Sequence, residues 1–294
     1  MRCPHVGGLV RIVFCAVFLG VVGLPILVLG LPTADLPHIK MENGVGRLIV
    51  NGRPFLFMGG ELDNSSAGTA AQADSIVPKL AALHLNTILV PVAWEQIEPK
   101  EGSFDFSILD HWMETARHCN MRLVLLWFGS WKNAFSNYAP SWVKSDPKRF
   151  PRAYSADGRP LEILSTLSAE SRRCDSRAFA ALLNHLREKD SQQQTVLMVQ
   201  VENEVGYLGR GRDRSREANL LLYFSDGYQR HWSVLSQQSA FSSRRNWQHT
   251  STNMVKGGVR CLEMPRTKYL WRGTMAAYIE AVARAGKSEY ALPM

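Results

Sequence analysis

A pair of polar residues follows a long apolar run near the middle of the chain. Residues 195–201 are mostly β-branched or apolar, which predicts a strand buried on both faces, as in a parallel sheet. Asn203 and Glu204 stand where that strand would end. An asparagine can hydrogen-bond a substrate hydroxyl, while a desolvated glutamate keeps its proton for general-acid catalysis. Taken alone, residues 202–205 favour a plainer explanation, a strand that ends in solvated carboxylates.

The elements around this pair predict a parallel sheet. Apolar runs predict further strands at 55–62, 86–94 and 121–128, and helical periodicity predicts helices at 74–85, 106–119 and 177–189. Buried strands that alternate with helices are typical of parallel α/β folds, whose strands all end at one edge. Polar or aromatic residues follow two of the other strands at that edge. They are Trp94, Glu95, Trp131, Lys132 and Asn133.

Shorter signals complete the predicted order of elements. Asn51-Gly52 predicts a hairpin turn between two strands, and Asp74 is the expected N-cap of the first helix. Residues 138–171 are rich in Pro, Ser and Arg and predict a long irregular wall of the cleft. A helix is expected at 271–285 and one more strand at 287–294.

Composition bounds the function classes. The 294 residues are 46% hydrophobic and 20% charged, which suits one large domain or two small ones. The net charge is +8, but the one arginine cluster, at 210–216, is interrupted by Asp213, so no nucleic-acid partner is expected. No glycine-rich phosphate motif follows a strand, and the five cysteines lack metal-site spacing. We therefore expect no cofactor and no metal.

The two ends of the chain differ from its middle. Residues 1–30 carry a positive charge at Arg2, near their start, and continue into an apolar run. This pattern predicts a signal peptide or a signal anchor. The remainder is then expected to be secreted, or to lie on the lumenal or external face of a membrane if the segment is uncleaved. Residues 45–294 form the expected main domain, in which 222–268 is irregular by composition.

Four motifs together resemble those of a known enzyme group. Residues 86–99, with Gly102 and the Phe-Asp-Phe at 104–106, resemble the second-strand signature of barrel β-galactosidases and related glycoside hydrolases. The segment Met-Val-Gln-Val-Glu-Asn-Glu-Val-Gly at 198–206 resembles their acid/base motif. Residues 127–133 and 139–144 resemble a branch of the same group. The likeness runs from about residue 48 to 219 and resumes at about 269.

This resemblance implies a fold, an activity and roles for single residues. It implies a (β/α)8 TIM-type barrel that hydrolyses terminal β-linked galactose with retention. Glu204 would be the acid/base and Asn203 would contact the sugar. Glu95 stands where many relatives carry asparagine. The residues implied to line the sugar pocket are Trp94, Glu95, Trp131, Lys132 and Asn133.

The barrel is expected to be incomplete at its C-terminal end. Retention requires two carboxyl groups about 5 Å apart, and in such barrels the nucleophile follows the seventh strand. The sequence shows only four clear strands, so the seventh strand and its nucleophile are expected beyond Met294. Within the chain, Glu289 is the nearest candidate for the nucleophile, but a weak one. Little activity is then expected from this chain. There are two alternatives to a β-galactosidase. One is a non-catalytic carbohydrate-binding remnant, and the other is a hydrolase of β-glucosides or mannosides.

Several candidates also have purely structural explanations. Trp94 and Trp131 fit core packing as well as they fit sugar stacking, because tryptophan is often mostly buried. Glu98 is expected to anchor the turn at Gly102. Glu202 is expected to pack in the barrel wall.

Overall fold

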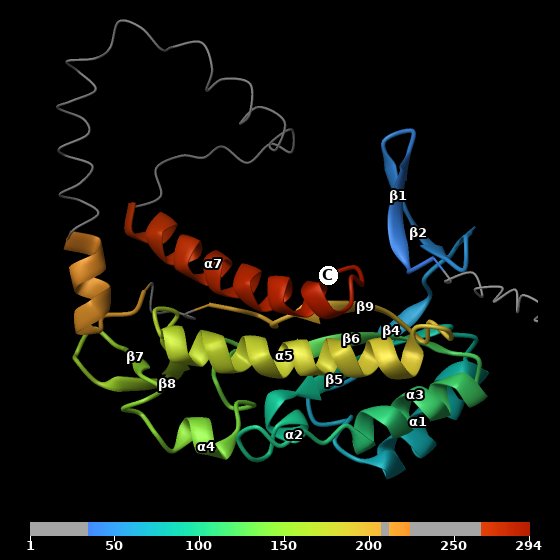
Figure 1. The fold of residues 1–294 in the computed structure, drawn as a ribbon, viewed down its shortest axis with the longest axis horizontal. Coiled ribbons are helices and arrows are strands. Elements are labelled where there is room, and N and C mark those ends of the chain that lie inside the picture. The colour runs from blue at the N-terminus through green and yellow to red at the C-terminus, as the bar shows by residue number, and fades with distance from the viewer. Residues whose placement is uncertain (1–34, 207–211, 224–265) are drawn as a thin grey trace, which may run out of the picture. The chain divides into compact units, whose positions relative to one another are not determined.

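A computed structural model describes residues 35–206, 212–223 and 266–294 (Figure 1). The predicted leader at 1–30 lies outside these ranges, as does nearly all of the predicted irregular segment at 222–268. Within the described ranges, no helix has both the length and the apolar character needed to cross a membrane.

A four-stranded parallel sheet forms the centre of the fold. Its spatial order is β4-β5-β6-β9, and each neighbouring pair is parallel. The predicted α/β class with a parallel sheet is therefore confirmed, and the carboxyl ends of the strands share one edge. The strands are β4 (Gly59–Glu61), β5 (Thr87–Ala93), β6 (Arg122–Phe128) and β9 (Val196–Val201).

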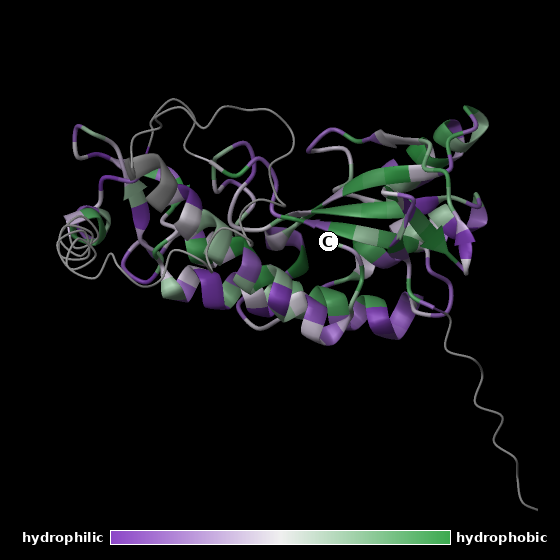
Figure 2. Ribbon diagram, turned by 90° about the horizontal axis from the view of Figure 1, so that it is seen from above, coloured by the Kyte–Doolittle hydropathy of each residue, from purple (hydrophilic) through white to green (hydrophobic). Residues whose placement is uncertain are grey.

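The two faces of the sheet carry different apolar clusters. In β6, Leu123, Leu125 and Trp127 belong to the main core, whereas Val124 and Phe128 belong to a smaller cluster on the other face. This alternation follows from the two-residue repeat of a strand. The strands are mostly hydrophobic along their length (Figure 2). The longer helices that share the main core are α1 (Ala70–Ala82), α3 (Ser107–His118), α5 (Ala169–Asp190) and α7 (Arg266–Glu289).

Two antiparallel sheets stand apart from the parallel one. In the first, Asn51 and Gly52 have φ angles of 50° and 73°, as the predicted hairpin turn requires. The second lies within 138–171, so that segment is only partly irregular, and a short helix precedes the hairpin. These elements are β1 (His38–Glu42), β2 (Val45–Val50), β3 (Arg53–Pro54), α4 (Ser141–Lys144), β7 (Arg152–Tyr154) and β8 (Pro160–Leu164).

Helix α1 begins before the predicted N-cap. The side chain of Thr69 accepts the Gln72 N–H at 3.3 Å, and Gln72 Oε1 accepts the Thr69 N–H at 3.0 Å. This reciprocal capping box fixes the start at Ala70. The prediction of Asp74 as N-cap was wrong. Asp74 lies inside the helix, where its carboxylate contacts Nε2 of His111 at 2.8 Å.

The C-terminal residues form a longer helix than predicted. The predicted helix at 271–285 is confirmed within α7, but the predicted strand at 287–294 is wrong, because α7 continues to Glu289. The residues that follow still lie beside β9. The N–H of Val199 donates to the carbonyl of Pro293 at 3.0 Å, and Leu292 is fully buried.

Candidate active site

The ends of β6 and β9 bring three predicted site residues together. Trp127 pairs in register with Val201, so the residues that follow the two strands are neighbours. The Nζ atom of Lys132 lies 2.9 Å from Oε2 of Glu204 and 2.5 Å from Oδ1 of Asn203. One ammonium therefore contacts both the predicted acid/base, Glu204, and the asparagine that precedes it.

Burial differs sharply within this group. The side chain of Glu204 is 60% exposed, whereas that of Lys132 is only 6% exposed. The Lys132 ammonium also lies 5.0 Å from the centroid of the Phe128 ring, within cation–π range. The site therefore presents one carboxylate to solvent, with a buried cation on its inner side. The expectation that Glu204 is desolvated was wrong for the described chain.

The backbone around Glu204 is held from both sides. Glu204 has a φ of 50°, and its carbonyl accepts the Ala134 N–H at 2.9 Å. Ala134 and Asn133 have φ angles of 56° and 53°, in a tight turn closed by two hydrogen bonds between Lys132 and Phe135. Positive φ angles are uncommon in residues with side chains, and they gather where tertiary contacts enforce them. Asn133 is exposed at the tip of this turn.

A second glutamate lies beneath the site. Glu202 is 2% exposed, and its two carboxyl oxygens accept the N–H groups of Ser130 at 3.0 Å and Trp131 at 2.8 Å. Burial, followed by the neighbouring Asp175, raises the pKa of Glu202 well above its ordinary range. The sequence predicted a packing role for Glu202 but gave no signal for Asp175, which comes from α5.

Both candidate tryptophan platforms lie in the core. Trp94 opens the short helix α2 (Trp94–Ile97) and is fully buried, with its Nε1 donating to Glu98 at 2.9 Å. Trp131 is also fully buried and packs edge-on against Tyr278, with ring centroids 4.4 Å apart. Sugar stacking requires an accessible ring face. The expectation that Trp94 and Trp131 bind sugar is therefore corrected: both support the site from within.

Comparison with known proteins decides the family. The GH42 β-galactosidase family profile matches residues 64–217, which is more than half of the chain. The chain belongs to this family. The match contains β5, β6 and β9 together with Lys132, Asn203 and Glu204. Among proteins of curated function, none matches the chain significantly.

Solved β-galactosidases share the fold of this GH42 chain. One is the enzyme from the psychrophilic Marinomonas ef1, with 13% identity and a TM-score of 0.53 over 81% of the chain. Another is a catalytic mutant of a GH42 β-galactosidase from G. stearothermophilus, with 18% identity and a TM-score of 0.55, again over 81% of the chain. The chain spans about a third of each structure, 36% and 35% of their lengths.

The remaining predicted pocket residue of the GH42 chain pairs elsewhere. Glu95 lies just past β5, and its Oε2 is 2.9 Å from Nζ of Lys144 rather than bonded to Lys132. The Glu95 N–H also donates to the carbonyl of Tyr138 at 3.0 Å. Its side chain is 38% exposed, so it remains available at the edge of the sheet.

The predicted structural role of Glu98 is confirmed. Its Oε1 accepts the Gly102 N–H at 2.7 Å, and its Oε2 accepts the Trp94 indole N–H. The guanidinium of Arg177 also pairs with this carboxylate. Glu98 is fully buried, so these contacts anchor the turn that the family motif encloses.

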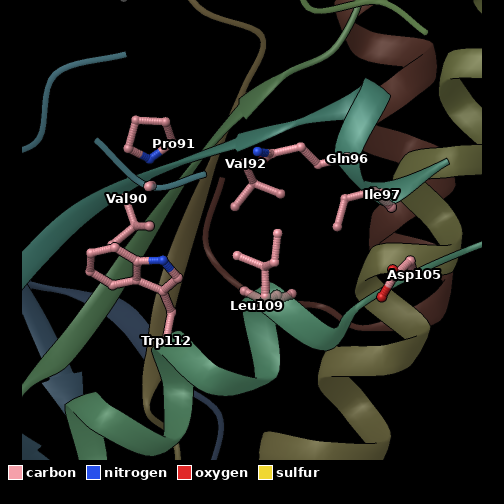
Figure 3. A pocket seen from close by; sticks show the side chains of 10 residues that line it. Val90, Pro91, Val92, Gln96, Ile97, Asp105, Leu109 and Trp112 are labelled. Atoms are coloured by element: carbon pink, nitrogen blue, oxygen red, sulfur yellow. The ribbon is translucent and has the colours of Figure 1, made fainter. Parts of the chain in front are cut away.

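A small cavity lies on the helix-covered face of the sheet. Leu109 and Trp112 of α3 rise toward Val90 and Val92 of β5 around about 30 Å³ of space (Figure 3). The buried Trp112 Nε1 has no hydrogen-bond partner among the described residues. This space can hold one water molecule but not a sugar ring. None of Lys132, Asn203 and Glu204 lines this cavity.

Metal ligands do not gather in the part of the chain that the structure describes. No group of three or more His, Cys, Asp or Glu residues is placed to hold an ion there. Cys119 and Cys174 are both free thiols. The other three cysteines lie outside the described residues.

Proposed function

We propose that this chain carries the acid/base part of a retaining β-galactosidase site, with Glu204 as proton donor and acceptor. The observation that carries the proposal is the position of Glu204. It is an exposed carboxylate at the carboxyl end of β9, held by Lys132 beside Asn203. In parallel α/β barrels this edge holds the catalytic groups. Membership of the GH42 family supports galactose as the sugar.

The same proposal includes the architecture. We infer that β4-β5-β6-β9 is part of a (β/α)8 barrel, with the β9 side continuing the sheet. The parallel order and the helices gathered on one face support this inference. The cluster of Val124, Leu126 and Phe128 on the other face has the apolar character of a barrel interior.

In the proposed reaction, Glu204 acts twice. It protonates the glycosidic oxygen while a second carboxylate attacks the anomeric carbon, and it then removes a proton from the water that releases the sugar. Asn203 hydrogen-bonds a sugar hydroxyl, and Lys132 fixes the positions of both residues. Glu95 and Asn133 line the entrance to the pocket.

Glu289 does not fit the role of the second carboxylate. Its Oε2 lies 3.4 Å from Nη1 of Arg187, near the end of α5 that leads into the amino end of β9. Glu204 follows the carboxyl end of the same strand. This separation favours a second candidate function, carbohydrate binding without hydrolysis, for any form of the protein that has no other nucleophile.

One experiment separates the two functions. The 294-residue chain is assayed on aryl β-galactosides, β-glucosides and β-mannosides, and galactose binding is measured in parallel by calorimetry. Turnover of the galactoside at least about 1,000-fold above that of Glu204→Gln supports the hydrolase and overturns the expectation of little activity from this chain. The matched control, Glu188→Gln on the exposed surface of α5, should leave turnover unchanged. Galactose binding without turnover supports the second candidate, and the absence of both contradicts both.

We also propose that the protein is secreted after removal of residues 1–30. Support comes from the sequence alone, in the positive start and the apolar run that follows it. Sequencing the N-terminus of the protein exported by a eukaryotic host tests this. A start near residue 31 supports secretion, whereas an intact Met1 on a membrane-bound product supports the anchored form.

A further inference from the structure

Two buried carboxyl groups converge on one backbone N–H beneath the site. The nitrogen of Ser130 lies 3.0 Å from Oδ2 of Asp175 and 3.0 Å from Oε1 of Glu202. Asp175 is fully buried and Glu202 is 2% exposed. The two carboxyl groups are therefore neighbours in one buried site, where burial and then the nearby Asp175 raise the pKa of Glu202.

The other donors around the pair are unequally divided. Asp175 also accepts the Trp127 indole N–H at 3.0 Å and the Ser130 hydroxyl at 2.6 Å. Glu202 receives one further donor, the Trp131 N–H at 2.8 Å. Since the hydroxyl hydrogen of Ser130 is directed to Asp175, the hydroxyl of Tyr278 must donate to Ser130 Oγ at 2.7 Å. Asp175 therefore has more donors to stabilise a negative charge.

Cations do not compensate two charges here. In the ranges that the structure describes, neither Asp175 nor Glu202 takes part in a salt bridge, and Lys132 is bonded to Asn203 and Glu204. Arg172 acts at longer range, through its electrostatic effect on Tyr278. Two uncompensated carboxylates in one buried site repel strongly, so one of them retains its proton. The donor count assigns that proton to Glu202.

The backbone beside the pair leaves no room for a side chain. A Cβ atom on Gly129 would lie 2.6 Å from Oε1 of Glu202 and 2.7 Å from Oδ1 of Asp175. It would also lie 2.3 Å from Nε1 of Trp127. The segment 129–132 is therefore fitted closely to the two carboxyl groups.

We propose that Asp175 and Glu202 form a proton-sharing pair that positions residues 129–132 and, through Lys132, the carboxylate of Glu204. Asp175 connects the end of β6 to α5, and Glu202 connects it to the end of β9. Both are positioning residues, because neither is accessible to substrate. The role of the pair in catalysis rests on the proposed function. The shared proton and the positioning of residues 129–132 do not depend on that function.

Thermal unfolding of the full chain between pH 5.5 and 8.5 tests the shared proton. An acid that is still protonated in the folded state releases its proton on unfolding, so folded stability is lost as pH rises toward the folded pKa. Glu202→Gln imitates the protonated form and avoids this loss. The Tm of Glu202→Gln should therefore rise relative to that of the wild type across this range, by about 3–5 °C for each pH unit below the folded pKa. A gap that stays constant or shrinks would overturn the proposal.

Glu170→Gln, on the helix α5 that carries Asp175, is the matched control for Glu202→Gln. Arg173 and Arg149 lower the pKa of Glu170 to about 2, so this carboxylate is ionised throughout the range in the folded protein and almost fully ionised in the unfolded chain. Its Tm difference from the wild type should stay nearly constant between pH 5.5 and 8.5. A difference that grows with pH in this variant as well would show that the effect is not specific to the pair.

Hydrogen exchange tests the hold on the turn without any need for activity. The amides of Ser130 and Trp131, which donate to Glu202, should exchange at least about tenfold faster in Glu202→Ala than in the wild type at pH 6. Glu202→Gln should retain most of the protection. Equal protection in all three proteins would overturn the positioning role, whatever the outcome of the galactoside assay.

Discussion

The ammonium of Lys132 lies 2.9 Å from the carboxylate of Glu204 and 2.5 Å from the amide oxygen of Asn203. A single cation from the end of β6 thus fixes two consecutive residues at the end of β9. Lys132 is 6% exposed, and its own turn bonds to the Glu204 carbonyl through Ala134. The position of the exposed carboxylate is therefore set by buried groups rather than by the surface.

Replacing Lys132 by methionine should impair both stability and the site. The change keeps the length of the side chain but leaves the buried Asn203 amide oxygen without its donor, which costs about 1–3 kcal/mol. Glu204 loses its partner in the same variant, so any galactoside turnover that the wild type shows should fall at least about tenfold. Urea unfolding and the aryl galactoside assay provide the two measurements.

Lys144→Met is the matched control for that variant. Lys144 pairs with Glu95 at 2.9 Å, but both side chains are more than 30% exposed. Exposed ion pairs contribute little, so its unfolding midpoint should differ from the wild type by much less than that of Lys132→Met. Equal losses in the two variants would contradict a special role for Lys132.

Substitution of Gly129 by alanine should be severe. The new methyl group would meet Trp127, Asp175 and Glu202 at less than 3.0 Å, and all three are held in the core. Overpacking of this kind typically costs about 1–3 kcal/mol and sometimes more. In Gly206→Ala, by contrast, the new methyl group would meet no atom of the described residues within 4 Å, so this variant should be close to neutral in the same unfolding experiment.

The sequence predicted the sheet well because its strands are buried on both faces. The β-branched runs of β5, β6 and β9 need no knowledge of their partners to be recognised. The placement of Lys132 and Glu204 at the same edge of the sheet also followed, because the carboxyl ends of parallel strands share an edge, but their direct contact was not predicted. Asp175 could not be predicted, since it lies mid-helix on α5 and its role depends on how α5 packs against the end of β6.

The positions of Trp94 and Trp131 show that a residue that follows a strand does not always face the cleft. Residues that follow a strand were expected to face the cleft, but α2 begins at once after β5 and turns the indole of Trp94 toward Glu98. The indole of Trp131 likewise turns inward, where it donates to the carbonyl of Leu164 at 3.3 Å. These orientations depend on partners 4 and 33 positions away in sequence, which no local pattern reports.

Helix α1 offers a direct comparison of the observed and the predicted cap. Thr69→Ala removes the acceptor for the Gln72 N–H and should cost about 1 kcal/mol of stability. Asp74→Ala removes exposed contacts with His111 and Thr115 but no cap, and it should cost clearly less. Urea unfolding of both variants decides between the two caps, and a larger loss for Asp74→Ala would contradict the observed start of the helix.

Acid unfolding should reveal the network around Glu170. Because Arg173 and Arg149 lower its folded pKa to about 2, the contribution of Glu170 is present above the unfolded value of 4.5 and is lost as pH falls toward 2. The Tm of Glu170→Gln should therefore lie below that of the wild type at pH 6, and the two should converge near pH 2–3. Because the side chain is 31% exposed, 1 M salt should reduce the gap at pH 6 as well. A gap that persists at low pH would mean that Glu170 stabilises α5 by packing rather than by charge.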